Sequence, residues 1–160
     1  MRGDAKVIEF LNAVLKGELT AVNQYWLHYR MLDNWGIAKL AAYERHESID
    51  EMKHADRLAE RVLFLDGLPA MQQLGRLRIG ETVPEILAAD LALEYEALAL
   101  LKQAVAHCEQ VGDFATRELF VSILESEEEH VDFIERQQSM IEAMGLPNYL
   151  QLQSKAAESS

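Results

Sequence analysis

The chain has 160 residues, 49% hydrophobic and 26% charged, which is the composition of a globular domain. Its formal net charge of −12 would repel phosphate backbones and anionic lipids, so neither nucleic acid nor a membrane is expected as a partner. A single cysteine, Cys108, excludes an intrachain disulfide and a thiolate metal cluster. Charged residues also interrupt the N-terminal apolar stretch where a secretory signal would lie, so a cytoplasmic location is expected.

Long helices are predicted because apolar residues recur at helical spacing and only three prolines interrupt the chain. Turn-forming clusters at 34–36 and 66–69 end the first two periodic runs. Thr82 and Glu85 match a capping box that opens the third run, and the pair 112–113 separates the third run from the fourth. The helices are predicted at about residues 5–33, 37–65, 83–111 and 114–144, with a short one at about 148–155.

The expected fold is all-α, a four-helix bundle in a single domain over residues 1–160. A helix of about 30 residues is ~45 Å long, so the short turns at 34–36 and 112–113 give two antiparallel hairpins. The segment 66–82, at up to ~3.3 Å per residue, can run the length of the bundle. One long crossover and a short fifth helix are typical of the ferritin-like topology.

Ionisable residues interrupt the apolar faces of all four long helices. Steps of three and four residues trace the face that each helix turns towards the core. One glutamate interrupts this face in the first and third helices, and a glutamate and a histidine three residues apart interrupt it in the second and fourth. An offset of 76 residues relates the first half of the set to the second, and the six residues are Glu18, Glu51, His54, Glu94, Glu127 and His130.

This set of residues predicts a site for two metal ions. Unpaired ionised carboxylates are costly in a low-dielectric interior, no lysine or arginine lies on the neighbouring core-facing positions, and two divalent cations would balance four carboxylates. Ferritin-like bundles hold iron or manganese with such Glu-x-x-His pairs. A single pair would more often lie on a helix surface, and Glu9 and Glu85 share the same offset although we expect both in solvent. The prediction therefore depends on all six residues together.

At these six residues the sequence resembles the bacterioferritin family, and the resemblance covers almost the whole chain. It implies a ferroxidase that oxidises Fe(II) with O2 and stores the ferric product as a mineral. It further implies two iron ions per subunit, a homo-oligomeric shell of 24 subunits built from two-fold dimers, and a ferredoxin as partner for iron release. In the implied centre Glu18 and His54 bind one iron, Glu94 and His130 the other, and Glu51 and Glu127 bridge.

Met52 has two interpretations. It follows Glu51 but points about 100° away around the helix, and by position alone it is an interface methionine. In bacterioferritins the equivalent methionines of two subunits bind the iron of haem b axially. The resemblance therefore implies about one haem per pair of subunits.

Three further residues also have two interpretations. By spacing alone His46 and Asp50 are an exposed polar pair, whereas the resemblance implies an iron site on the inner wall of the shell. Tyr25 is by position a core tyrosine, whereas the resemblance implies a residue that donates an electron during oxidation. Some family members carry tyrosine and tryptophan where this chain has Leu58 and Phe133, so electron supply through those two positions is not expected.

Two other functions fit the bundle. One is a small di-iron oxygen-using enzyme or peroxidase of rubrerythrin type, although a single cysteine cannot build the cysteine-rich module that such proteins usually add. The other is a structural or haem-binding bundle with an empty centre. Metal analysis of the purified protein distinguishes the last from a di-iron protein.

Overall fold

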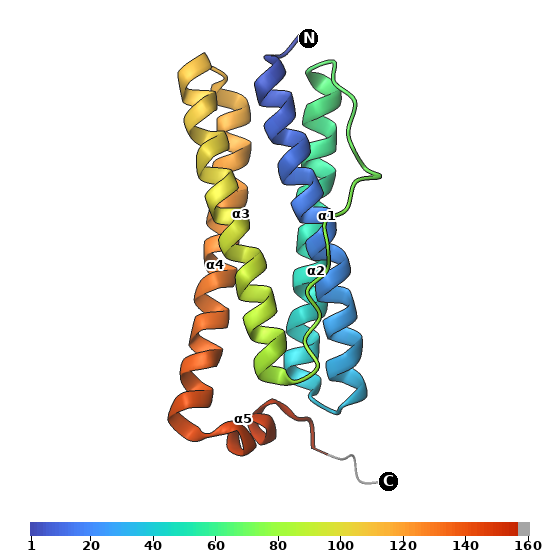
Figure 1. Cartoon of the computed structure of the whole chain (residues 1–160), viewed down its shortest axis with the longest axis vertical. Coiled ribbons are helices and arrows are strands. Elements are labelled where there is room, and N and C mark those ends of the chain that lie inside the picture. Colours follow the sequence, from blue (N-terminus) through green and yellow to red (C-terminus); the bar gives the residue numbers. More distant parts are fainter. Residues whose placement is uncertain (157–160) are drawn as a thin grey trace.

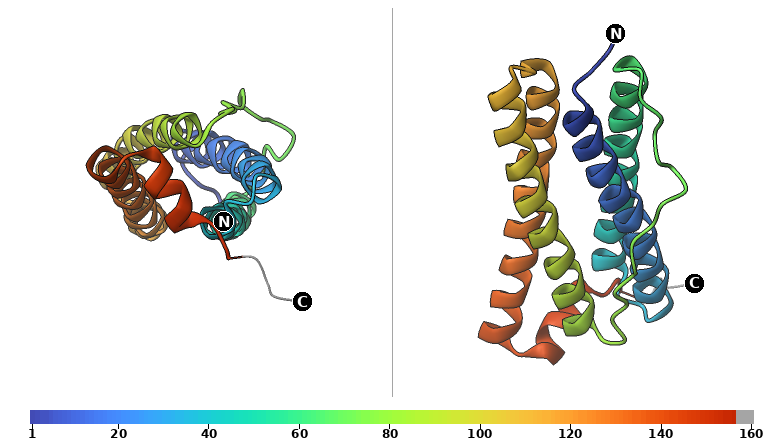
Figure 2. Two further views of the ribbon diagram at one scale, coloured as in Figure 1. Left: turned by 90° about the horizontal axis from the view of Figure 1, so that it is seen from below. Right: turned by 45° about the horizontal axis from the view of Figure 1, so that its top comes forward.

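The computed structural model describes residues 1–156, so residues 157–160 of the expected domain lie outside the described part. Helices α1 and α2 form one antiparallel hairpin and α3 and α4 a second, and α5 lies across the end of the bundle where α4 finishes (Figures 1 and 2). The expected all-α fold is confirmed. No helix in the described range is long and apolar enough to cross a membrane. The helices are α1 (Ala5–Asn34), α2 (Ala38–Phe64), α3 (Val83–Val111), α4 (Phe114–Met144) and α5 (Leu146–Gln153).

Local signals set the ends of the helices. Thr82 and Asp113 each accept a hydrogen bond from the backbone N–H three residues further on, and so cap α3 and α4. Gly112 ends α3 at φ 77°, a left-handed conformation that favours glycine. The bounds of the four long helices agree with prediction within one residue. The fifth begins at Leu146, two residues earlier than predicted, because Pro147 fits the first turn of a helix, where no N–H donor is required.

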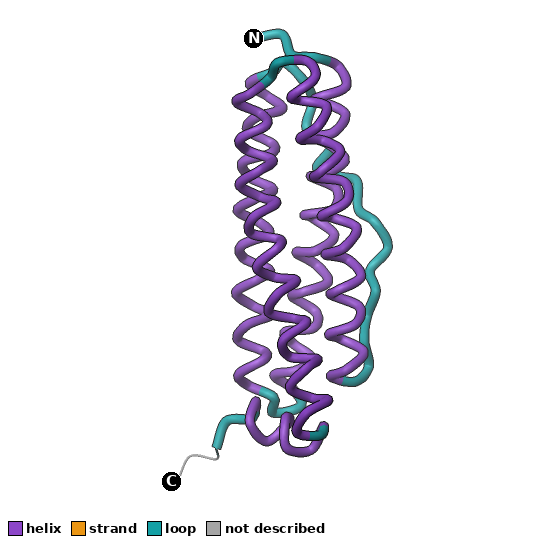
Figure 3. Tube along the Cα trace, turned by 90° about the vertical axis from the view of Figure 1, so that its left-hand side faces the viewer, coloured by secondary structure: helices purple, strands orange, loops and turns teal. Residues whose placement is uncertain are grey.

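The crossover, residues 65–82, runs along the outside of the bundle from the end of α2 to the start of α3 (Figure 3). Three side chains four residues apart on α1, Thr20, Gln24 and His28, hold it in place, and we call them the α1 anchor. They accept hydrogen bonds of 2.8, 3.0 and 3.0 Å from the backbone N–H groups of residues 75, 78 and 80, respectively. At Gly80 the crossover passes so close to α3 that a Cβ would lie 2.3 Å from the backbone nitrogen of Ile86.

Apolar side chains fill both ends of the bundle interior, and polar side chains fill the middle. The apolar cluster near the chain's N-terminus includes Leu11, Leu58, Leu101 and Phe120, and the cluster near α5 includes Leu32, Leu40, Ile86 and Ile134. Between these clusters each long helix turns ionisable side chains inwards. The polar level therefore lies near the middle of the bundle, enclosed by all four helices.

Candidate metal centre

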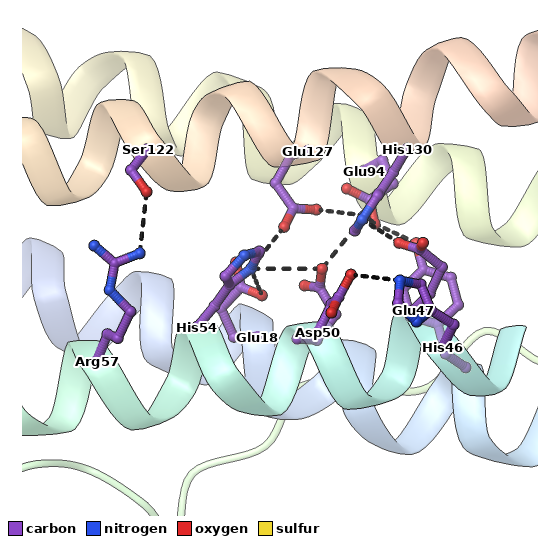
Figure 4. A network of polar contacts seen from close by, with 12 residues as sticks. Glu18, His46, Glu47, Asp50, His54, Arg57, Glu94, Ser122, Glu127 and His130 are labelled. Carbon is purple, nitrogen blue, oxygen red and sulfur yellow. Dashed lines mark hydrogen bonds and ion pairs between the residues drawn. The ribbon is translucent and has the colours of Figure 1, made fainter. Parts of the chain in front are cut away.

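The structure brings the six predicted ligands together in this polar level (Figure 4). The four carboxylates are only 1–2% exposed, the side chain of His130 is 6% exposed, and that of His54 is partly buried at 12%. Each long helix contributes through the register that the sequence predicted: Glu18 comes from α1, Glu51 and His54 from α2, Glu94 from α3, and Glu127 and His130 from α4.

The ligand atoms form two groups, and the atoms within each group lie within 4.8 Å of one another. Glu51 and Glu127 belong to both groups. One oxygen of Glu127 lies 3.2 Å from Nδ1 of His54, and its other oxygen lies 3.3 Å from Nδ1 of His130. Two shared carboxylates between two imidazoles are the arrangement that a pair of bridged metal ions requires. The groups are Glu18, Glu51, His54 and Glu127, and Glu51, Glu94, Glu127 and His130.

The donor set fits cations. Among the described residues, both carboxylate oxygens of Glu127 and one each of Glu18, Glu51 and Glu94 are buried without a hydrogen-bond partner. Buried polar atoms without partners are costly, and oxygen and imidazole donors suit iron or manganese. Two divalent ions would therefore satisfy these atoms and neutralise the four carboxylates.

Several ionisable groups of the centre have raised pKa values and retain protons. Burial, followed by the neighbouring charge of Glu18, raises the pKa of Glu51 well above its usual range. Burial would lower the pKa of His54, but its contacts with Glu127 and Glu18 raise that pKa to about 9. The pKa of His130 is also raised, against its burial, by contacts with Glu127 first and then Glu47. The protonated histidines therefore place positive charge beside the carboxylates of the centre.

Tyr25 lies within the centre rather than beside it. Its side chain is 1% exposed, and its hydroxyl donates a hydrogen bond to the carboxylate of Glu94. Burial, followed by the charge of Glu94, raises the pKa of the Tyr25 hydroxyl well above its usual range, so the hydroxyl keeps its proton. The tyrosine therefore fixes the orientation of one carboxylate of the centre.

Glu47 contacts the centre although the sequence pattern predicted no role for it. Although it lies on α2 one turn before Glu51, it is buried and forms an ion pair with Nε2 of His130. Its ligand atom also lies close to those of His46 and Asp50, which form a 3.2 Å pair at the bundle surface. Glu47 thus connects the buried centre with the exposed pair (Figure 4). Its four-residue spacing from Glu51 places it on the same face of α2, and this spacing could have indicated its burial.

Met52 lies outside the centre, as its position on the helix predicted. It is 41% exposed on α2, and Trp26 on α1 is 42% exposed. The two positions at which the sequence departs from some family members are both occupied by packed side chains. Leu58 is fully buried in an apolar cluster, and Phe133 stacks on Tyr43 with ring centroids 3.5 Å apart.

A second buried group, His28, Glu44 and Asp90, has the proximity of a metal site but a different role. Nε2 of His28 accepts the N–H of Gly80, so Nδ1 carries the ring proton and donates it to Asp90 at 2.9 Å. Burial, followed by the charge of Asp90, raises the pKa of Glu44 well above its usual range, so Glu44 keeps its proton. Nε2 of His28 holds the crossover and Nδ1 pairs with Asp90 on α3, so neither ring nitrogen has a lone pair left for a metal.

A four-helix bundle with one long crossover, whose centre joins four glutamates and two histidines from all four helices, defines a ferritin-like di-metal carboxylate protein. The Ferritin family, described as a ferritin-like domain, matches residues 8–144. The chain belongs to the bacterioferritin family, as its similarity to named relatives shows.

These relatives align over nearly their whole length. The chain is 52% identical over 145 residues to a bacterioferritin of Rhodobacter capsulatus, covering 91% of this chain and 90% of that protein. It is 48% identical over 158 residues to a bacterioferritin of Brucella melitensis, covering 99% and 98%. It is 47% identical over 145 residues to the bacterioferritin BfrA of Mycobacterium tuberculosis, covering 91% of each.

Family membership and the buried cluster together give the function. The chain is an iron-storage protein with a di-iron ferroxidase centre, and its cofactors are the di-iron centre and haem. Its expected assembly into a homo-oligomeric shell also follows from the family.

Proposed function

We propose that this centre oxidises Fe(II) with O2 and that each of the six ligands has the role its position indicates. The observation that carries the proposal is that the two ligand groups share Glu51 and Glu127, and no other residue. In the proposed arrangement Glu18 and His54 would hold one iron ion, Glu94 and His130 would hold the other, and Glu51 and Glu127 would be shared between them.

The chain's own side chains favour the oxidised metal. Two bound Fe(II) ions would supply one electron each, which with two protons would reduce O2 to hydrogen peroxide, and the anionic carboxylates would stabilise the higher charge of Fe(III). Glu51 and Glu127 keep the two ions close enough to react as a pair, while the hydroxyl of Tyr25 keeps the carboxylate of Glu94 turned towards its metal. In this proposal Tyr25 is also placed to supply an electron, because its ring packs edge-on against His130 with centroids 6.4 Å apart.

A second part of the proposal concerns iron on its way to the mineral. His46 and Asp50 would bind iron on the inner wall of the shell, and Glu47 would lie on the path between that pair and the centre. The contact of Glu47 with His130 on one side, and its proximity to the exposed pair on the other, supports this path.

A third part concerns haem and the assembly. We propose that the exposed Met52 side chains of two subunits bind one haem b across a two-fold axis, since a thioether suits a buried electron-transfer haem. The shell would contain 24 subunits built from such dimers, with one domain over residues 1–160 per subunit. A ferredoxin would supply electrons for iron release, and the protein would act in the cytoplasm.

Replacing Glu94 and Glu127 together by alanine tests the centre. Fe(II) oxidation under O2 should fall by ~100-fold or more, because each proposed iron site loses at least one ligand. The fold should persist, since deletion of buried carboxylates that lack partners need not destabilise the metal-free protein. Oxidation is followed by absorbance of the ferric product, and folding by circular dichroism.

A matched double variant, Glu9→Ala with Glu128→Ala, removes one exposed carboxylate from each hairpin and should keep the original rate. If the Glu94 and Glu127 double variant oxidised Fe(II) as fast as this control, the proposed centre would be wrong.

A further inference from the structure

One cavity connects the ferroxidase centre with solvent. It has a volume of about 700 Å³ and lies between α1, α3 and the crossover, and the carboxylates of Glu18, Glu51, Glu94 and Glu127 lie at its base. The crossover that forms one wall is visible beside α1 in Figure 1. Whatever reaches the centre through this cavity must pass its solvent-exposed rim.

The charges of the rim and the base are opposite in sign. Three of the chain's 15 lysines and arginines line this cavity, namely Lys16, Arg76 and Arg78, and all three are exposed. Arg78 pairs with Glu96, which also lines the cavity. Lys16 and Arg76 form no ion pair with any described residue. The rim therefore keeps a net positive charge in a strongly acidic chain.

The α1 anchor holds this rim in place. The backbone N–H groups of Gly75 and Arg78 are bound by Thr20 and Gln24, so the crossover is fixed on both sides of Arg76. A cationic group on a fixed backbone loses less freedom when it binds an anion than one on a loose loop. The backbone that carries the positive charges of the rim is therefore already fixed before an anion binds.

Opposite charges at rim and base select what can occupy the cavity. A bare divalent cation is attracted to the carboxylates but meets two unpaired cations first, and a bare anion binds at the rim but is repelled from the base. Between them the wall is mainly apolar or small, with residues such as Val14, Leu93 and Leu100, and a low-dielectric wall strengthens both effects. A divalent cation that arrives with an oxyanion satisfies both ends.

We propose that Lys16 and Arg76, with Arg78 beside them, form a binding site for a small oxyanion that accompanies Fe(II) to the centre. Phosphate and the carboxylates of a small iron chelator share the required chemistry, since both present charged oxygens to ammonium and guanidinium groups. The iron half of this inference rests on the proposed function of the centre, whereas the anion site itself does not.

Calorimetric titration of the assembled, iron-free protein with inorganic phosphate tests the site, at constant ionic strength set by chloride. We expect about one phosphate per subunit, and a double variant, Lys16→Gln with Arg76→Gln, should bind it about tenfold more weakly or not at all. Lys39→Gln with Lys102→Gln removes the same charge from exposed positions that do not line the cavity and should leave binding unchanged.

A parallel titration with citrate distinguishes the two sources of the oxyanion, because a rim that binds only citrate indicates a chelate and one that binds phosphate indicates the free anion. The proposal would be overturned if the unmodified protein bound neither phosphate nor citrate. It would also be overturned if the Lys16 and Arg76 double variant bound them as tightly as the Lys39 and Lys102 control. Fe(II) oxidation measured in chloride alone reports on the centre independently, so a protein that oxidises Fe(II) but binds no oxyanion loses only this inference.

Discussion

Protons and metal ions compete for the same buried atoms of the centre. The pKa of His54 is raised from 6.5 to about 9 by contacts that overcome its burial, and burial raises the pKa of Glu51. Both groups therefore hold protons that a metal must displace. Since the raised pKa of His54 keeps its proton bound until the pH approaches about 9, the affinity for a divalent metal should rise with pH across the interval from 6.5 to about 9.

The affinity for Co(II), which O2 does not readily oxidise in this setting, measures this competition by absorbance. Each displaced proton contributes about a tenfold gain in affinity per pH unit. The number of protons released per metal ion into a weakly buffered solution during the same titration should match the slope of log affinity against pH. An affinity that stays constant over this interval would mean that the metal-free centre is already deprotonated.

Substitution of Met52 distinguishes its two interpretations, a haem ligand and an interface residue. Met52→Leu keeps size and apolarity, so packing should survive, but leucine cannot bind iron. After reconstitution with haem, the unmodified protein should bind about one haem per two subunits, as two-fold symmetry requires, and the variant should bind almost none. Haem absorbance gives the occupancy, and Fe(II) oxidation at the separate centre should persist. Full haem occupancy in the variant would return Met52 to the interface interpretation.

The crossover depends on buried polar side chains of α1. Gln24 accepts the N–H of Arg78 and donates to Asp90, so Gln24→Ala leaves the part-buried N–H of Arg78 without its partner and removes one of the two contacts to Asp90, which keeps His28. We expect a loss of about 1–3 kcal/mol in the free energy of unfolding and faster hydrogen exchange in residues 75–80. Urea unfolding and exchange mass spectrometry measure the two effects. Asn23→Ala, which removes a local hydrogen bond on the adjacent residue, should leave exchange in the crossover unchanged.

Helical periodicity predicted the elements and the ligands but not the contacts between elements. The inward orientation of each of the six predicted ligands could be predicted because it is set by its own helix, a property of local sequence. The partner of Glu47 could not be identified in this way, because its contact with His130 depends on the relative rotation of α2 and α4. The α1 anchor was missed for a related reason, since polar residues such as Gln24 and His28 gave no periodic signal for a partner in an irregular segment.

At the scale of the whole molecule, the storage function requires assembly. A shell of 24 subunits should have a mass near 24 times the 18.2 kDa of one chain, and native mass spectrometry can measure it together with iron and haem content. The Glu94→Ala and Glu127→Ala double variant should assemble equally well, because its changes lie inside the bundle. A monodisperse monomer or dimer at micromolar concentration would exclude a storage shell while leaving the di-iron chemistry intact.

The division of the ligands between the two hairpins has a consequence for how the protein is made. Glu18, Glu51 and His54 belong to the first hairpin, and the other three ligands belong to the second, which leaves the ribosome later. A nascent chain with only the first hairpin therefore has three of the six donors and neither complete group. Because both groups include Glu127 on α4, a nascent chain cannot assemble either of them before α4 has been synthesised. The fold thereby withholds a potentially damaging reaction with oxygen until the surrounding protein is in place to contain the product.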